Sequence, residues 1–238
     1  AARNLAGTDA GTNYAVWGHS QGGHAALFSG DDAASYAPEL HLVGVAAAAP
    51  AAELAALVAL QWQNYVSWII GSEVITVWPQ FYPQLTAAQI ATPLAIQQSP
   101  AIGAACITAN PTALLAQFGA TLIQPFFAVN PVTVPAWFAE FTTNTPSAPA
   151  NVPVFIAQGL QDDVVLPSTT ALLATQWCGQ GAALTMQWIP SANHFTVPAL
   201  AAASAVGWMQ QAFAGPSPGS TCTQAPPVAP AVNPAAPA

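Results

Sequence analysis

The stretch that decides the fold is Gly18-His19-Ser20-Gln21-Gly22, which fits the pattern G-x-S-x-G. A strand-like apolar run, Tyr14-Ala15-Val16-Trp17, leads into it, and a helix-compatible run, Gly23-His24-Ala25-Ala26-Leu27-Phe28, follows it. Glycines on both sides of a serine allow a sharp, strained strand-to-helix turn and keep bulk away from the hydroxyl. We therefore interpret Ser20 as a candidate nucleophile at the carboxyl edge of a parallel sheet. The Gln21 backbone N–H would then face a developing oxyanion.

The rest of the chain alternates strand-like and helix-like segments around a different middle part. Apolar runs predict strands at residues 13–17, 41–48, 152–157 and 184–189. Helical patterns follow the serine turn to about residue 29 and recur at 54–69, 168–178 and 197–213. Strand–helix alternation indicates a parallel sheet with crossover helices, so the fold class is α/β.

Aromatic residues concentrate between Ala52 and Phe141, where the alternation stops. We expect an α/β core from residues 1–50 and 136–215, with a helical insertion at 51–135. The aromatic side chains either pack this insertion or line an apolar substrate trench, and the two interpretations are compatible. Proline and alanine dominate residues 216–238, which predicts an irregular tail.

Charged residues make up only 4% of the 238 residues, with Arg3 as the single cation and a formal net charge of −8. Nucleic-acid binding is excluded because it needs lysine or arginine to neutralise phosphates. Anionic membrane surfaces are disfavoured for the same reason. Mean hydropathy is +0.44, yet no run of about 18 apolar residues suggests a spanning helix.

No signal-peptide pattern is visible in the N-terminal residues, and the sequence starts with alanine rather than methionine. It is consistent with a mature product, a trimmed product or a fragment. Three cysteines, Cys106, Cys178 and Cys222, leave one unpaired if two form a disulfide.

A nucleophilic serine needs a base, and the base needs a carboxylate that orients it. In hydrolases with this turn the order along the chain is serine, acid, histidine, each after a strand. The loop after the third strand carries Asp162 and Asp163, three and four residues after Gly159. Either could serve as the acid, and we favour Asp162. The alternative is that both are only polar loop residues.

His194 is the candidate base, because it alone among four histidines lies beyond the acid and after a strand. His19 and His24 border the serine turn and are expected to pack or hydrogen-bond locally, while His41 begins a strand. Metal-ligand spacings, phosphate-binding loops and dinucleotide fingerprints are all absent from the sequence. We expect neither a metal nor a cofactor.

Several stretches resemble the secretory lipases of the Candida antarctica lipase A type, and more closely their actinobacterial relatives. They are Val16-Trp17-Gly18-His19-Ser20-Gln21-Gly22-Gly23, Ala157-Gln158-Gly159-Leu160-Gln161-Asp162-Asp163-Val164-Val165, Asn193-His194-Phe195-Thr196, and Trp208-Met209-Gln210-Gln211-Ala212-Phe213-Ala214-Gly215 followed by Cys222. The resemblance runs over nearly the whole chain.

The resemblance implies an α/β-hydrolase fold with a helical cap inserted after the strand that follows the serine turn. It also implies Ser20 as nucleophile, Asp162 as acid and His194 as base. A Cys178–Cys222 disulfide is implied as well, which suits a secreted protein.

One departure from the family pattern concerns the N-terminus. The family places several strands before the serine turn, and one of their loops supplies the second oxyanion donor. Here about a dozen residues precede the first strand, so we expect N-terminal strands to be missing and the sheet edge to be bare. The partner of Cys106 would lie in the same missing segment.

The predicted function is hydrolysis of apolar carboxylic esters such as acylglycerols, at a lipid–water interface, through an acyl-enzyme. One alternative is an acyltransferase that uses the same residues. Another is a non-catalytic fragment that binds apolar surfaces. Oligomeric state is not encoded in these patterns.

Overall fold

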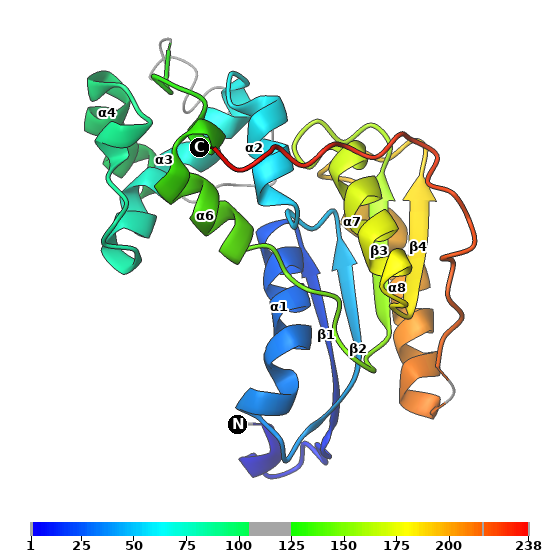
Figure 1. Cartoon of the computed structure of the whole chain (residues 1–238). Coiled ribbons are helices and arrows are strands. Elements are labelled where there is room, and N and C mark those ends of the chain that lie inside the picture. Colours follow the sequence, from blue (N-terminus) through cyan, green and yellow to red (C-terminus); the bar gives the residue numbers. More distant parts are fainter. Residues whose placement is uncertain (1, 105–124, 216, 238) are drawn as a thin grey trace. The chain divides into compact units, whose positions relative to one another are not determined.

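A computed structural model describes residues 2–104, 125–215 and 217–237. The chain divides into two compact units (Figure 1). The sheet unit comprises Ala1–Ala52 and Pro146–Ala231, and the helical unit comprises Glu53–Thr145 and Val232–Ala238. The assignment of residues 51–135 as a cap stays a prediction.

Four parallel strands form the sheet that the described residues contain, in the order β1-β2-β3-β4. They are β1 (Asn13–His19), β2 (His41–Ala48), β3 (Val154–Gly159) and β4 (Leu184–Ile189). Strands β2 and β3 are almost fully buried, as expected of central parallel strands covered on both faces. The predicted α/β class is confirmed.

Helices cover both faces of this sheet. On one face, α1 (Gln21–Tyr36) and α7 (Pro167–Gly179) pack through Leu27, Leu173 and Trp177. On the other face, α8 (Val197–Ala214) packs through a row of alanines and Trp208 (Figure 1). This arrangement brings the carboxyl ends of all four strands to one edge of the sheet.

Helix α1 runs to Tyr36, well beyond the predicted end near residue 29. The sequence suggested an earlier end because Gly30, Asp31 and Asp32 are poor helix formers. Tertiary contacts outweigh that preference: Gly30 is buried with Pro149 close to it, and Asp31 accepts a hydrogen bond from the Ser147 backbone N–H at 2.9 Å.

The described part of the C-terminal tail has no helix or regular strand, and its residues 219–222 lie along the outer edge of β4. Thr221 N donates to Leu184 O at 2.8 Å, and Thr221 Oγ1 accepts from Met186 N at 2.7 Å. A disulfide joins Cys178, at the end of α7, to Cys222. The tail therefore satisfies edge groups of β4 that would otherwise be unpaired.

The described helical unit is built from α2 (Leu54–Gln61), α3 (Tyr65–Phe81), α4 (Pro93–Gly103) and α6 (Pro135–Thr143). Short 3-10 turns at Ala87–Gln89 and Pro131–Thr133 connect them. Aromatic rings form its core, with Trp78 stacked on the fully buried Trp137 at a centroid distance of 6.1 Å. Packing within the unit thus accounts for Trp78 and Trp137.

The single helix predicted at residues 54–69 is wrong, because two helices occupy this segment. Helix α2 ends at Gln61, and α3 begins after Asn64. The Asn64 side chain accepts from Val66 N at 3.1 Å, which caps the new helix. The apolar spacing continues through the break, so periodicity alone could not reveal it.

None of the described helices is long and apolar enough to cross a membrane. Cys106, whose partner the sequence left open, lies outside the described residues.

Candidate active site

Ser20 sits at the turn between β1 and α1 in a conformation that non-glycine residues rarely adopt, with φ 56° and ψ −120°. The turn is tight because Gly18 lies against the Gly22 backbone, where a Cβ would overlap the carbonyl. Ser20 N donates to Ala48 O at 2.9 Å, which ties the turn to the end of β2. The surrounding backbone therefore holds Ser20 in its strained conformation.

Asp162 follows β3 and is buried, with 4% of its surface exposed. Its Oδ1 accepts from Val164 N at 2.9 Å and from Val165 N at 2.8 Å. The neighbouring Asp163 is exposed. Of the two aspartates considered from sequence, Asp162 is the one that lies against a histidine.

His194 follows β4 and lies between Asp162 and Ser20. Its Nδ1 is 2.9 Å from Asp162 Oδ2, and its Nε2 is 2.9 Å from Ser20 Oγ. A carboxylate can only accept, so Nδ1 carries the proton and Nε2 is free to accept from the serine hydroxyl. The structure thus brings Ser20, Asp162 and His194 into one hydrogen-bonded chain.

His19 lies directly beside this chain. Its Nε2 is 2.9 Å from the His194 backbone O, and the two imidazole rings lie 4.7 Å apart. Burial, followed by the nearby His194, lowers the pKa of His19 below its usual 6.5. His19 was expected to pack or hydrogen-bond locally, but this bond reaches the loop that carries His194, 175 residues further along the chain.

Gln21 is the first residue of α1, where backbone N–H groups lack a partner within the helix. Its predicted role as an oxyanion donor stays a prediction.

His24 packs on Phe28 with ring centroids 5.0 Å apart. His41 Nδ1 lies 3.2 Å from Asn13 Oδ1, at the amino ends of the strands.

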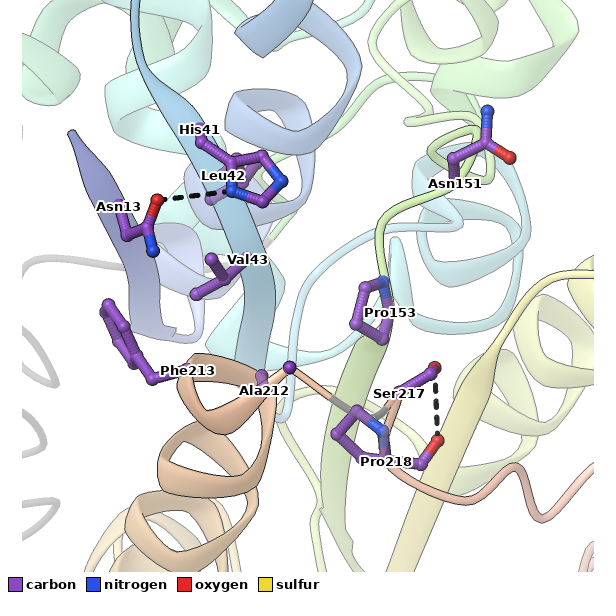
Figure 2. A pocket seen from close by; sticks show the side chains of 11 residues that line it. Asn13, His41, Leu42, Val43, Asn151, Pro153, Ala212, Phe213, Ser217 and Pro218 are labelled. Carbon is purple, nitrogen blue, oxygen red and sulfur yellow. Dashed lines mark hydrogen bonds between the residues drawn. The ribbon is translucent and has the colours of Figure 1, made fainter.

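A cavity of about 240 Å³ lies at those amino ends, away from Ser20. Figure 2 shows the bonded pair His41 and Asn13 together with Pro153, Phe213 and Ser217 around it. Its lining residues come from the edge of the sheet opposite the one that carries the serine, aspartate and histidine.

Among the residues that the structure describes, no cluster of three or more histidine, cysteine, aspartate or glutamate side chains could hold a metal ion.

One contact of Asp162 was missed by sequence reasoning. Gln158, in β3, is fully buried and places its Nε2 3.2 Å from Asp162 Oδ2. Its only sequence signal is an amide directly after the apolar run Val154-Phe155-Ile156-Ala157. Such a residue needs buried partners, but the sequence does not name them.

The fold is that of the α/β-hydrolases. The match to a family profile described as "Secretory lipase" extends over residues 1–221, so the chain belongs to the secretory lipase family.

Solved structures share the fold at low sequence identity. Candida antarctica lipase A in its closed state is 20% identical with a TM-score of 0.66, and the match covers 92% of this chain and 52% of that one. A rice cell wall degrading esterase, LipA from Xanthomonas oryzae, is 18% identical with a TM-score of 0.64, covering 87% and 60%. A putative hydrolase from Legionella pneumophila is 12% identical with a TM-score of 0.60, covering 87% and 58%.

The chain thus spans between half and two thirds of the length of these solved structures. No curated protein matches it.

Proposed function

We propose that the chain is a serine carboxylic ester hydrolase that acts through an acyl-enzyme. The observation that carries the proposal is the hydrogen-bonded chain from Ser20 Oγ through His194 to Asp162, with 2.9 Å at each link. The strained backbone of Ser20 supports it, because strain at a single serine after a strand is typical of a nucleophile turn.

In the proposed acylation, Ser20 Oγ attacks the ester carbonyl carbon while His194 Nε2 takes the hydroxyl proton. The C–O bond to the alcohol then breaks, and His194 returns the proton to the leaving alkoxide. Asp162 keeps the imidazole in the tautomer with Nδ1 protonated and stabilises the imidazolium. Water attacks the acyl-enzyme in the same way and releases the acid and the free serine.

The negative charge on the carbonyl oxygen needs donors placed before the reaction starts. The Gln21 backbone N–H, at the start of α1, is the proposed donor from this chain. The helix dipole of the 16-residue α1 adds to its effect, since the positive end lies at the N-terminus.

The proposed substrates are apolar acyl esters such as acylglycerols, met at a lipid–water interface. The aromatic and apolar composition, with a single cation, favours uncharged over anionic substrates. The proposed location is extracellular: the family is described as secretory, and the Cys178–Cys222 disulfide is typical of oxidising compartments.

The test is to incubate the chain with a fluorophosphonate probe and with short- and long-chain p-nitrophenyl esters, beside Ser20→Ala and the exposed control Ser35→Ala. We expect labelling and turnover in the wild type and in Ser35→Ala, and neither in Ser20→Ala. Product partition in added alcohol separates hydrolysis from acyl transfer. A folded wild-type sample without labelling or turnover would contradict the proposal and favour a non-catalytic, surface-binding role.

A further inference from the structure

Gln158 is a neutral amide with no exposed surface, second to last in β3. Burying an amide is unfavourable unless its donors and acceptor are all paired. The residues before it in the strand are apolar, and an apolar side chain here would pack without this requirement. The partners of this one amide therefore need an explanation.

The contacts of Gln158 fix which way its amide points. Thr170 Oγ1 donates to Gln158 Oε1 at 2.7 Å. On the other side, Gln158 Nε2 lies 3.1 Å from Gly159 O, 3.1 Å from Val165 O and 3.2 Å from Asp162 Oδ2. All three are acceptors, so only the NH2 group can face them, and its two hydrogens serve three oxygens.

Gln158 and His194 bind the same oxygen of Asp162. Oδ1 is held by the backbone N–H groups of Val164 and Val165, while Oδ2 receives Gln158 Nε2 and His194 Nδ1. The backbone pair anchors one oxygen, and rotation of the carboxylate would move the other. Gln158 opposes that rotation through its contact with Oδ2.

We propose that Gln158, oriented by Thr170, is a positioning residue that fixes Asp162 Oδ2 toward His194. This inference rests on the proposed function, because it assigns Asp162 the task of orienting the base. Gln158 touches neither Ser20 nor the reacting atoms, so it acts through Asp162 alone. Thr170 acts one step further back, since its hydroxyl donates to Oε1 and holds the other end of the amide in place.

The test compares Gln158→Met, which keeps volume and removes the donor, with the near-isosteric Gln158→Glu. The matched control is Gln161→Met, the same change at an exposed side chain of the loop that follows β3. We expect Gln158→Met to lower kcat about 10- to 100-fold, as for a lost hydrogen bond to a charged group, with KM within about 2-fold. Gln161→Met should match the wild type.

The pH dependence separates positioning from mere packing. In Gln158→Glu the introduced carboxyl can donate to Asp162 Oδ2 only while it is protonated, and when ionised it repels that carboxylate. We expect its kcat to exceed that of Gln158→Met at low pH and to lose ground as the pH rises. Thr170→Ser, which keeps the hydroxyl, should retain activity that Thr170→Val loses.

The proposal is overturned if folded Gln158→Met keeps wild-type kcat, or if Gln158→Met and Gln158→Glu lose the same factor at every pH. A second readout needs no turnover: the downfield proton NMR signal of His194 Nδ1–H bonded to Asp162. We expect Gln158→Met to shift or broaden it and Gln161→Met to leave it unchanged. An unchanged signal in Gln158→Met overturns the positioning role, whereas failure of wild-type turnover alone counts against the proposed function.

Discussion

Two buried carboxyl groups, one in each unit, have opposite surroundings. Asp162 in the sheet unit and Glu53 in the helical unit are each 4% exposed. Asp162 has donors on both oxygens: two backbone N–H groups, a glutamine amide and a histidine. Glu53 Oε1 has no hydrogen-bond partner among the described residues.

The consequence for Glu53 is a raised pKa. Burial raises the pKa of its carboxyl, and a hydrogen bond from the Asn233 side chain only partly offsets this. The two carboxyl groups are equally buried, but they differ in how many hydrogen-bond donors reach them. Four hydrogen bonds hold the carboxyl group of Asp162, whereas that of Glu53 has one donor and one buried oxygen without a partner among the described residues, which is unfavourable for its charged form.

The same chemical change, carboxyl to amide, should therefore lower activity at Asp162 and raise stability at Glu53. Asp162→Asn has the largest expected effect: kcat falls about 10³- to 10⁴-fold, because an amide favours the wrong tautomer of His194. Steady-state hydrolysis of a p-nitrophenyl ester measures it. The control is Asp163→Asn at the exposed neighbour, which should stay near wild type. Equal losses in both variants would contradict the assignment of Asp162.

His19 extends the comparison within the sheet unit, since it is a half-buried group whose ring hydrogen-bonds a backbone oxygen. His19→Phe removes the bond to His194 O, and we expect kcat to fall about 3- to 10-fold. His19→Gln keeps a donor and should retain most of that activity. A loss as large in His19→Gln as in His19→Phe would show that ring packing matters instead.

The same variants test the pH dependence of stability. The pKa of His19 is lower in the folded chain than 6.5, so the unfolded chain binds the proton more readily. The contribution of this group to the free energy of unfolding is fully present above pH 6.5 and is lost as the pH falls toward the lowered pKa. Urea unfolding between pH 5 and 8 should show a weaker acid-side loss in both His19 variants than in the wild type.

Glu53→Gln has the smallest expected effect, and it should raise thermal stability, whereas Asp162→Asn should lower kcat. The raised pKa means that the folded chain resists ionisation, so the penalty is absent below about pH 4.5 and grows as the pH rises through the folded pKa. We expect Tm at pH 7 to rise by about 2–4 °C, the shift that 1 kcal/mol gives in a chain of this size.

The difference should vanish at pH 4, and the exposed control Glu39→Gln should show no gain. A lower Tm for Glu53→Gln at pH 7 would mean that its carboxyl is stabilised in a way that the described contacts do not include.

The sequence by itself determined the local features of the sheet unit. The G-x-S-x-G turn, the strands at 41–48 and 184–189 and the order serine, aspartate, histidine all follow from residue type and spacing. These features depend on contacts between near neighbours, such as the close approach of Gly18 to Gly22. Short-range sterics and apolar periodicity suffice for them.

Only the tertiary structure shows that Asp162, and not the exposed Asp163, lies against His194, and only it reveals the partners of Gln158. The choice depends on His194, 32 residues from Asp162 and 174 from Ser20. Tertiary contacts also set the end of α1 at Tyr36, and the Asn64 cap, invisible to the apolar periodicity, set the break before α3. The physical reason is that a hydrogen bond between distant residues needs a fold to bring its atoms within 3 Å, and periodicity carries no information about that distance.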